Sequence, residues 1–238
     1  MIYGFSTGAL ALGDFERGLA ICREFSLEAV ELSALRESEL PNLVQSLDSI
    51  DLHDFTAVSL HAPSSLRDMT ETHLVELLDR VTKLNMSIVV HPNVISNIAL
   101  WRRFGRWLCI ENMDKRKPIG RTAAELRPIL SELPEAKLCV DLGHARQVDP
   151  SMAVAAEILT EFNDRVTHLH VSDVNSSSHH EPLSRAAIHA FQQVAALVPP
   201  SVVVILESTF CTANPCVELE IEAAKDIFSA VQQLVVAS

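Results

Sequence analysis

Most of the short apolar runs in this sequence end in an imidazole or a carboxylate. The runs that end this way are Val30-Glu31, Leu60-His61, Val90-His91, Ile110-Glu111, Val140-Asp141, Leu169-His170 and Leu206-Glu207. Imidazoles mixed with carboxylates are good ligands for zinc, manganese, iron and cobalt. Burying so many ionisable groups without partners would be costly, and a cation supplies the missing compensation. The residue types therefore predict a metal site, provided that the fold brings the run ends together.

The apolar runs are the strands that must position these side chains. We expect strands at Ile2–Thr7, Ala29–Ser33, Ala57–His61, Ile88–His91, Leu108–Asn112, Leu138–Asp141, Val166–Val171 and Val202–Glu207. Helical periodicity fills the intervals, at Asp14–Phe25, Glu37–Leu47, Leu66–Leu84, Ile95–Arg103, Thr122–Leu133, Ser151–Phe162, Arg185–Leu197 and Val217–Val236. Several strands are continuously apolar, a pattern typical of parallel strands that are covered on both faces.

Eight strand–helix units follow one another with no linker rich in Pro, Gly or Ser. Each unit takes roughly 30 residues, the size of one β–α step. This predicts one α/β domain over residues 1–238, a closed (β/α)8 TIM barrel, and leaves an open doubly wound sheet as the main competitor. The barrel is favoured because the units are even and no Gly-rich dinucleotide loop follows the first strand. In such a barrel all C-terminal strand ends open on one face, where active sites are built, so the run-end residues converge.

Composition narrows the classes of function. The chain has 19 basic and 31 acidic residues, a formal net charge of −12, which argues against nucleic-acid binding. No apolar run approaches the ~20 residues that a membrane helix needs, and the N-terminus lacks the pattern of a secretory signal. The five cysteines contain no Cys-x-x-Cys pair. They are typical of reduced thiols, so we expect a cytoplasmic protein.

Six short motifs carry a resemblance to a known family. In chain order they are Leu-His-Ala-Pro (60–63), Val-His-Pro (90–92), Ile-Glu-Asn (110–112), Val-Asp-Leu-Gly-His (140–144), His-Val-Ser-Asp (170–173) and Leu-Glu-Ser (206–208). In this order, one per strand, they are similar to those of the xylose isomerase-like TIM-barrel superfamily. That superfamily contains sugar isomerases and epimerases, and also endonuclease IV. The resemblance covers essentially the full length.

Resemblance to the isomerase and epimerase branch implies one divalent cation. Its ligands would be Glu111, Asp141, His170 and Glu207. Glu111 and Glu207 would also act as catalytic acid and base on opposite sides of a substrate carbon, while the cation stabilises an enediolate. This is the preferred hypothesis from sequence: a metal-dependent isomerase or epimerase acting on a sugar, a sugar phosphate or a related polyol. Zinc or manganese suits the ligands best, and magnesium, cobalt and iron stay open.

Resemblance to endonuclease IV implies instead that further ligands hold three zinc ions. His61, His91 and His144 match those ligands by motif, and His180 before Glu-Pro-Leu matches a loop histidine. The resemblance to sugar-processing barrels leaves a second role open for these histidines, as contacts to the substrate or supports of the ligands. The family has an aspartate two residues before the loop histidine, and here the residue is Ser178, which puts the third metal site in doubt. The alternative function is therefore a metal-dependent phosphodiesterase or AP endonuclease. A third alternative is a barrel that binds a metal or a polyol without turnover.

Three further residues are candidates for substrate binding. Glu31 ends the second strand and faces the same mouth, so it could accept a hydrogen bond from substrate. Lys115 and Arg116 begin a basic loop (115–121) after the fifth strand, which could bind a phosphate or could simply be solvated. The expected partner is a small polyhydroxylated molecule, phosphorylated or not, with no nucleic acid and no membrane. Substrate identity, the number of metals and assembly into a homo-oligomer stay open.

Overall fold

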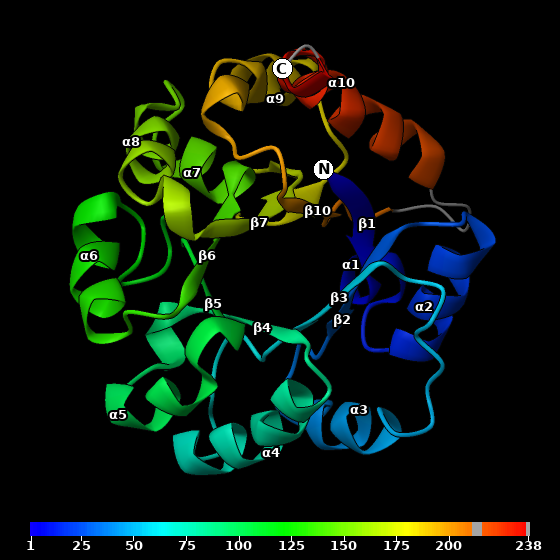
Figure 1. Cartoon of the computed structure of the whole chain (residues 1–238), viewed down its shortest axis with the longest axis vertical. Coiled ribbons are helices and arrows are strands. Elements are labelled where there is room, and N and C mark those ends of the chain that lie inside the picture. The colour runs from blue at the N-terminus through cyan, green and yellow to red at the C-terminus, as the bar shows by residue number, and fades with distance from the viewer. Residues whose placement is uncertain (211–215, 237–238) are drawn as a thin grey trace.

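Eight parallel strands close into a barrel in the structure, a computed structural model that describes residues 1–210 and 216–236, with side chains placed up to residue 229. Around the ring the order is β1 (Ile2–Ser6), β10 (Val203–Leu206), β7 (Val166–Val171), β6 (Lys137–Asp141), β5 (Leu108–Glu111), β4 (Ser87–Val90), β3 (Ala57–His61) and β2 (Ala29–Ser33) (Figure 1). Every neighbouring pair is parallel. The predicted (β/α)8 TIM barrel is confirmed.

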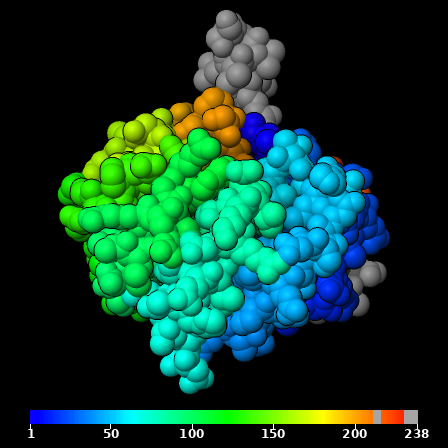
Figure 2. Space-filling model, turned by 60° about the horizontal axis from the view of Figure 1, so that its bottom comes forward, coloured from blue at the N-terminus to red at the C-terminus, as the bar shows by residue number. Residues whose placement is uncertain are grey.

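Helices surround the strands (Figure 1). They are α2 (Phe15–Glu24), α3 (Leu40–Ser46), α4 (Glu71–Lys83), α5 (Ile98–Trp101), α6 (Ala123–Glu132), α8 (Ala153–Glu161), α9 (Arg185–Gln192) and α10 (Val217–Val236). The space-filling view in Figure 2 shows the side of the molecule over α3 to α6, where the helices cover the barrel. Among the described residues, no helix has the length and apolarity that crossing a membrane requires.

Some elements differ from the sequence prediction. The helix expected from Leu66 begins at Glu71, because the carboxylate of Glu37 accepts backbone N–H groups of Arg67, Asp68 and Met69 and holds them as a loop. Two short helices were missed, α1 (Thr7–Ala11) after β1 and α7 (Leu142–Val148) after β6. Each has too few turns to show a helical period. A small hairpin, β8 (Asp173–Val174) with β9 (His180–Glu181), forms where a loop was expected.

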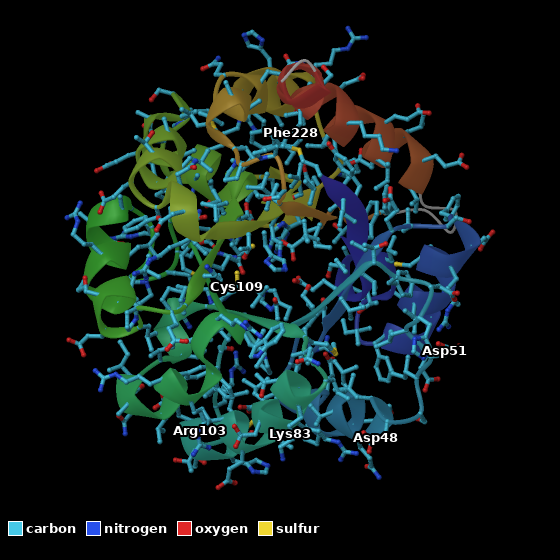
Figure 3. All side chains as sticks on the ribbon, viewed as in Figure 1. Asp48, Asp51, Lys83, Arg103, Cys109 and Phe228 are labelled. Carbon is cyan, nitrogen blue, oxygen red and sulfur yellow. The ribbon has the colours of Figure 1, made fainter. Side chains whose placement is uncertain are left out.

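The barrel interior is layered along the strands. Below the strand ends lies a small cluster of Val89, Cys109 and Cys139, all buried. Cys109 lies inside the ring of strands, whereas Lys83 and Arg103 point outward from the surrounding elements (Figure 3). Inward-facing side chains alternate with outward-facing ones along each strand. The next inward positions toward the C-terminal ends therefore carry the ionisable residues described below, above a floor of small uncharged side chains.

Candidate metal centre

A pocket of about 400 Å³ opens at the C-terminal ends of the strands. Its ionisable lining includes His61, His91, Glu111, His144, His180 and Glu207. Another depression of similar volume, about 410 Å³, lies near the start of β5 against Trp101, Gly105 and Pro134. That second pocket contains no histidine or cysteine, so it lacks the ligands of the first. The chemistry of the molecule is concentrated at the C-terminal face, as expected for this barrel type.

Four of the predicted ligands form one compact group. Glu111, Asp141, His170 and Glu207 each offer one ligand atom, and these atoms lie within 4.8 Å of one another. The first three side chains are buried, whereas Glu207, just after β10, keeps 13% of its side chain exposed toward the pocket. The structure thus brings together the four residues that the motifs singled out. This spacing suits the donors of one divalent cation.

A second group shares Glu111 with the first. His61 Nε2 lies 3.0 Å and His91 Nε2 lies 3.2 Å from Glu111 Oε2. The two rings meet edge to face, with centroids 5.0 Å apart. His61 ends β3, and His91 directly follows β4, so neighbouring strands place both imidazoles on the same carboxylate oxygen.

A third group consists of Asp141, His144 and His180. Asp141 caps α7, since its Oδ1 accepts the backbone N–H of His144 at 2.6 Å. This cap turns the His144 ring back toward the barrel, with its Nδ1 3.4 Å from Asp141 Oδ2. His180 comes from the hairpin, where its Nδ1 contacts Ser172 Oγ at 2.7 Å. The short helix α7, missed in the sequence, is therefore what positions His144.

Glu111 lies between imidazoles on both sides. Its Oε2 faces His61 and His91, and its Oε1 lies 3.2 Å from His144 Nδ1 and 3.6 Å from His170 Nδ1. Glu111 belongs to two candidate metal groups, and Asp141 also belongs to two. Glu111 would therefore be shared between the two groups if both held a cation. The arrangement is suited to more than one metal.

Several buried polar atoms at the centre have no hydrogen-bond partner. They are Glu31 Oε1, His91 Nδ1, Asp141 Oδ2, and both ring nitrogens of His170. Buried polar groups are nearly always hydrogen-bonded, and each unsatisfied one is expensive. Atoms of these types are ordinary metal donors. The donor set therefore fits divalent cations on chemical grounds as well as by spacing.

Electrostatics at the centre are dominated by buried carboxylates. Burial alone would lower the pKa of the His61 and His144 imidazoles, but the carboxylates of Glu111 and Asp141 outweigh it and raise these pKa values to about 9 and about 10. Burial raises the pKa of Glu207 and that of Asp141. The carboxylates thus need positive charge beside them, either protons on imidazoles or metal ions.

Glu31 does not line the pocket. Its side chain is fully buried, with Oε1 3.1 Å from His170 Nε2 and Oε2 accepting a hydrogen bond from Ser59 Oγ at 2.9 Å. We predicted a substrate contact for Glu31, and its position beneath His170 excludes a direct one. The carboxylate lies against the His170 ring, and Glu31 also forms a candidate donor group with His61, His170 and Glu207.

In the basic loop after β5, the residues that line the pocket are shifted by one position from those predicted. Lys115 is exposed and absent from the pocket wall, whereas Arg116 and Lys117 line it. A substrate contact by Lys115 therefore stays a prediction, and Arg116 and Lys117 are the members of the loop that line the pocket. Lys117 belongs to the basic loop (115–121) for which phosphate binding was left open, although it was not singled out as a site residue.

The side chain of Arg116 stabilises this loop through hydrogen bonds. Its guanidinium donates hydrogen bonds to the Asp114 carboxylate and to the carbonyls of Ser177 and Ser178. Asp114 is buried, lines the pocket and was also missed. Ser178, which replaces the aspartate of the endonuclease IV pattern, exchanges hydrogen bonds with the Gln147 side chain. The loop and the hairpin are thus fastened together at the rim.

Comparison with known proteins gives structural relatives only. No protein-family model and no curated protein matches the sequence. Among solved structures, 3-keto-D-glucoside 4-epimerase YcjR from E. coli has a TM-score of 0.59 at 14% identity, covering 96% of this chain and 99% of that one. Endonuclease IV from Thermus thermophilus has a TM-score of 0.58 at 17% identity, covering 98% and 99%. A xylose isomerase-like TIM barrel protein from Mycobacterium smegmatis, in complex with magnesium, has a TM-score of 0.55 at 14% identity, covering 92% and 90%.

Proposed function

From the fold that this chain shares with the xylose isomerase-like TIM barrels, we propose that it is a hydrolase with more than one divalent cation, acting on the phosphate ester of a small molecule. The observation that carries the proposal is the position of Glu111, whose two oxygens face imidazoles on opposite sides. The His61–His91 pair adds two imidazole donors at Glu111 beyond the four residues that suffice for one cation. The excess of 31 acidic over 19 basic residues argues against a nucleic-acid substrate.

Two complete ligand sets support this reaction. One cation would bind to His61, His91 and Glu111, and a second to Glu111, Asp141, His170 and Glu207. A third, at Asp141, His144 and His180, would lack the ligand that Ser178 replaces. Zinc is the best match for this mixture of imidazole and carboxylate, and manganese is the next. When bound, such cations would neutralise the phosphate and make a water molecule more acidic.

The chain's own side chains supply binding and proton transfer. Glu207 reaches the pocket, and burial raises the pKa of its carboxyl, so it is the group that would exchange a proton with water or substrate. Burial lowers the pKa of His180 to about 4, so this ring is neutral at pH 7 and can donate or accept a hydrogen bond at the leaving oxygen. Lys117 supplies a positive charge at the rim for the phosphate.

A second candidate is the metal-dependent isomerase or epimerase expected from sequence. The compact group of Glu111, Asp141, His170 and Glu207 favours it, because those four residues suffice for one cation. Glu111 and Glu207 would then exchange a proton with a substrate carbon from opposite sides. The contacts of Glu111 with four imidazoles count against this role, since a catalytic base needs an oxygen free to meet the substrate.

Elemental analysis of protein purified without chelator separates the two candidates. The hydrolase proposal expects two or three equivalents of zinc or manganese per chain and release of inorganic phosphate from small phosphate esters. A single equivalent, together with exchange of substrate carbon-bound protons into heavy water and no phosphate release, would establish the isomerase or epimerase instead. A matched His168→Gln variant, altered one strand position deeper than the ligands, is the control for general disturbance of the barrel.

A further inference from the structure

The pocket has two walls of opposite chemistry. In the ring of strands, β1 and β5 are four places apart in either direction, so they face each other across the barrel. The wall that follows β1 and β2 presents Gly8, Ala9, Leu12 and Leu35. The wall that follows β5 presents the loop with Lys117. The metal centre lies between them at the strand ends.

Exposed leucines mark the first wall. Leu12 is 65% exposed and Leu35 is 43% exposed, and the described residues include only two other exposed large apolar side chains, Leu84 and Leu219. Leu12 also has φ 53° and ψ −125°, a backbone conformation that is unfavourable for a branched side chain. Leu12 and Leu35 line the same pocket as the ionisable centre, so an apolar group bound there would cover leucine surface that water otherwise reaches.

Lys117 gives the second wall a charge with unused donors. Its ammonium donates one hydrogen bond, to the Ser64 carbonyl at 2.9 Å, and forms no ion pair with any residue that the structure describes. An ammonium has three donors, so two remain for a ligand. Arg116 beside it is occupied by Asp114 and two carbonyls, so Lys117 is the cation available to an anion.

We propose that the substrate is amphiphilic: its phosphate lies between the metal centre and Lys117, and an alkyl or aryl group rests on Ala9, Leu12 and Leu35. The inference rests on the proposed function only for the place of the phosphate. A purely polyhydroxylated substrate would leave the leucine wall exposed in the complex. An apolar substituent removes that surface from water, and the gain grows with each methylene that it covers.

The test uses alkylphosphonates, which cannot be hydrolysed at the P–C bond, so that binding is measured without turnover. Dissociation constants of methylphosphonate and hexylphosphonate are measured by calorimetry on the metal-containing protein as purified. We expect hexylphosphonate to bind at least tenfold tighter, because about twofold per half-covered methylene accumulates along the chain. In a Leu12→Ser, Leu35→Ser double variant this advantage should fall below about threefold, with methylphosphonate binding unchanged.

Matched variants serve as controls. Leu219→Ser and Leu84→Ser remove leucines that are 64% and 42% exposed away from the pocket, and they should keep the full advantage. Lys117→Met should weaken both phosphonates about tenfold. Equal affinity for the two phosphonates, or an advantage that survives in the double variant, would overturn the inference. If two metals and phosphate release are found but the two phosphonates bind equally, the proposed function stands and the amphiphilic substrate is wrong. If hexylphosphonate binds more tightly through the two leucines but no phosphate is released, the apolar wall stands and the proposed function is wrong.

Discussion

Two histidines of β7 lie two residues apart on the same face of the strand, yet their surroundings are opposite. His168 contacts Thr167 Oγ1 at 3.0 Å and Cys109 Sγ at 3.6 Å, and burial lowers its pKa to about 4. His170 is also buried, but Cys139 and the carboxylates of Glu207, Glu31 and Glu111 outweigh burial and raise its pKa well above the usual value. The comparison shows that burial alone does not define the centre. The carboxylates that contact its ring make His170 a candidate ligand, whereas His168, whose described contacts are with Thr167 and Cys109, stays in the core.

The largest contrast is expected between His170→Gln and His168→Gln. Replacing His170 removes a donor from the central group, so at least one metal equivalent and about a thousandfold or more of activity should be lost. Replacing His168 should leave metal content unchanged and cost about 1–3 kcal/mol of stability, typical of a buried polar substitution. Elemental analysis and thermal unfolding of both variants measure this. Equal loss of metal from the two variants would show that His168 and His170 do not differ in their relation to the metal centre.

Removal of the metal by a chelator should lower the stability of the fold, because the cations would bind only to residues at the strand ends. Ligand at a thousandfold its dissociation constant stabilises a fold by about 4 kcal/mol per site. For a chain of this size, this corresponds to about 8–16 °C in Tm. Scanning calorimetry before and after removal of metal by a chelator checks it. The Glu111→Gln variant is the control, because its Tm should respond much less.

The metal-free protein should lose stability as pH rises. The pKa values of His61 and His144 are raised from 6.5 to about 9 and about 10, so their protonated forms stabilise the fold fully below pH 6.5. This contribution is lost as pH passes through 9 to 10. Tm of the chelated protein should therefore fall across that window, whereas Tm of the metal-loaded protein should fall less. Parallel pH profiles for the two forms would contradict the charge balance proposed for the centre.

A smaller loss of metal affinity is expected from substitution of Glu31, which lies behind His170. Glu31→Gln keeps a hydrogen-bonding group of the same shape but removes the charge beside His170 Nε2. Outer partners of metal ligands typically contribute 10–100-fold in metal affinity. Competition with a chromophoric chelator measures that affinity. Unchanged affinity would show that Glu31 is only a core residue.

The strand ends were predictable because strand periodicity and parallel topology act together. Seven apolar runs ended in ionisable residues, and a closed parallel barrel has only one place for such ends. The rim was not predictable in the same way. Whether Lys115 or Lys117 faces the pocket depends on the loop conformation that the Arg116–Asp114 contact holds. The sequence correctly placed Glu31 at the C-terminal face of the barrel. That its carboxylate is buried against His170 depends on a residue from a distant strand, and no local sequence pattern reveals that contact.

Anomalous scattering from crystals grown without chelator tests the central claim most directly. The account predicts two strong metal peaks, one on each side of the Glu111 carboxylate and about 3.5–4 Å apart, as in other two-metal sites. One peak would lie toward His61 and His91, and the other toward Asp141, His170 and Glu207. A single peak among Glu111, Asp141, His170 and Glu207, with His61 and His91 hydrogen-bonded to the carboxylate and bearing no metal, would contradict it.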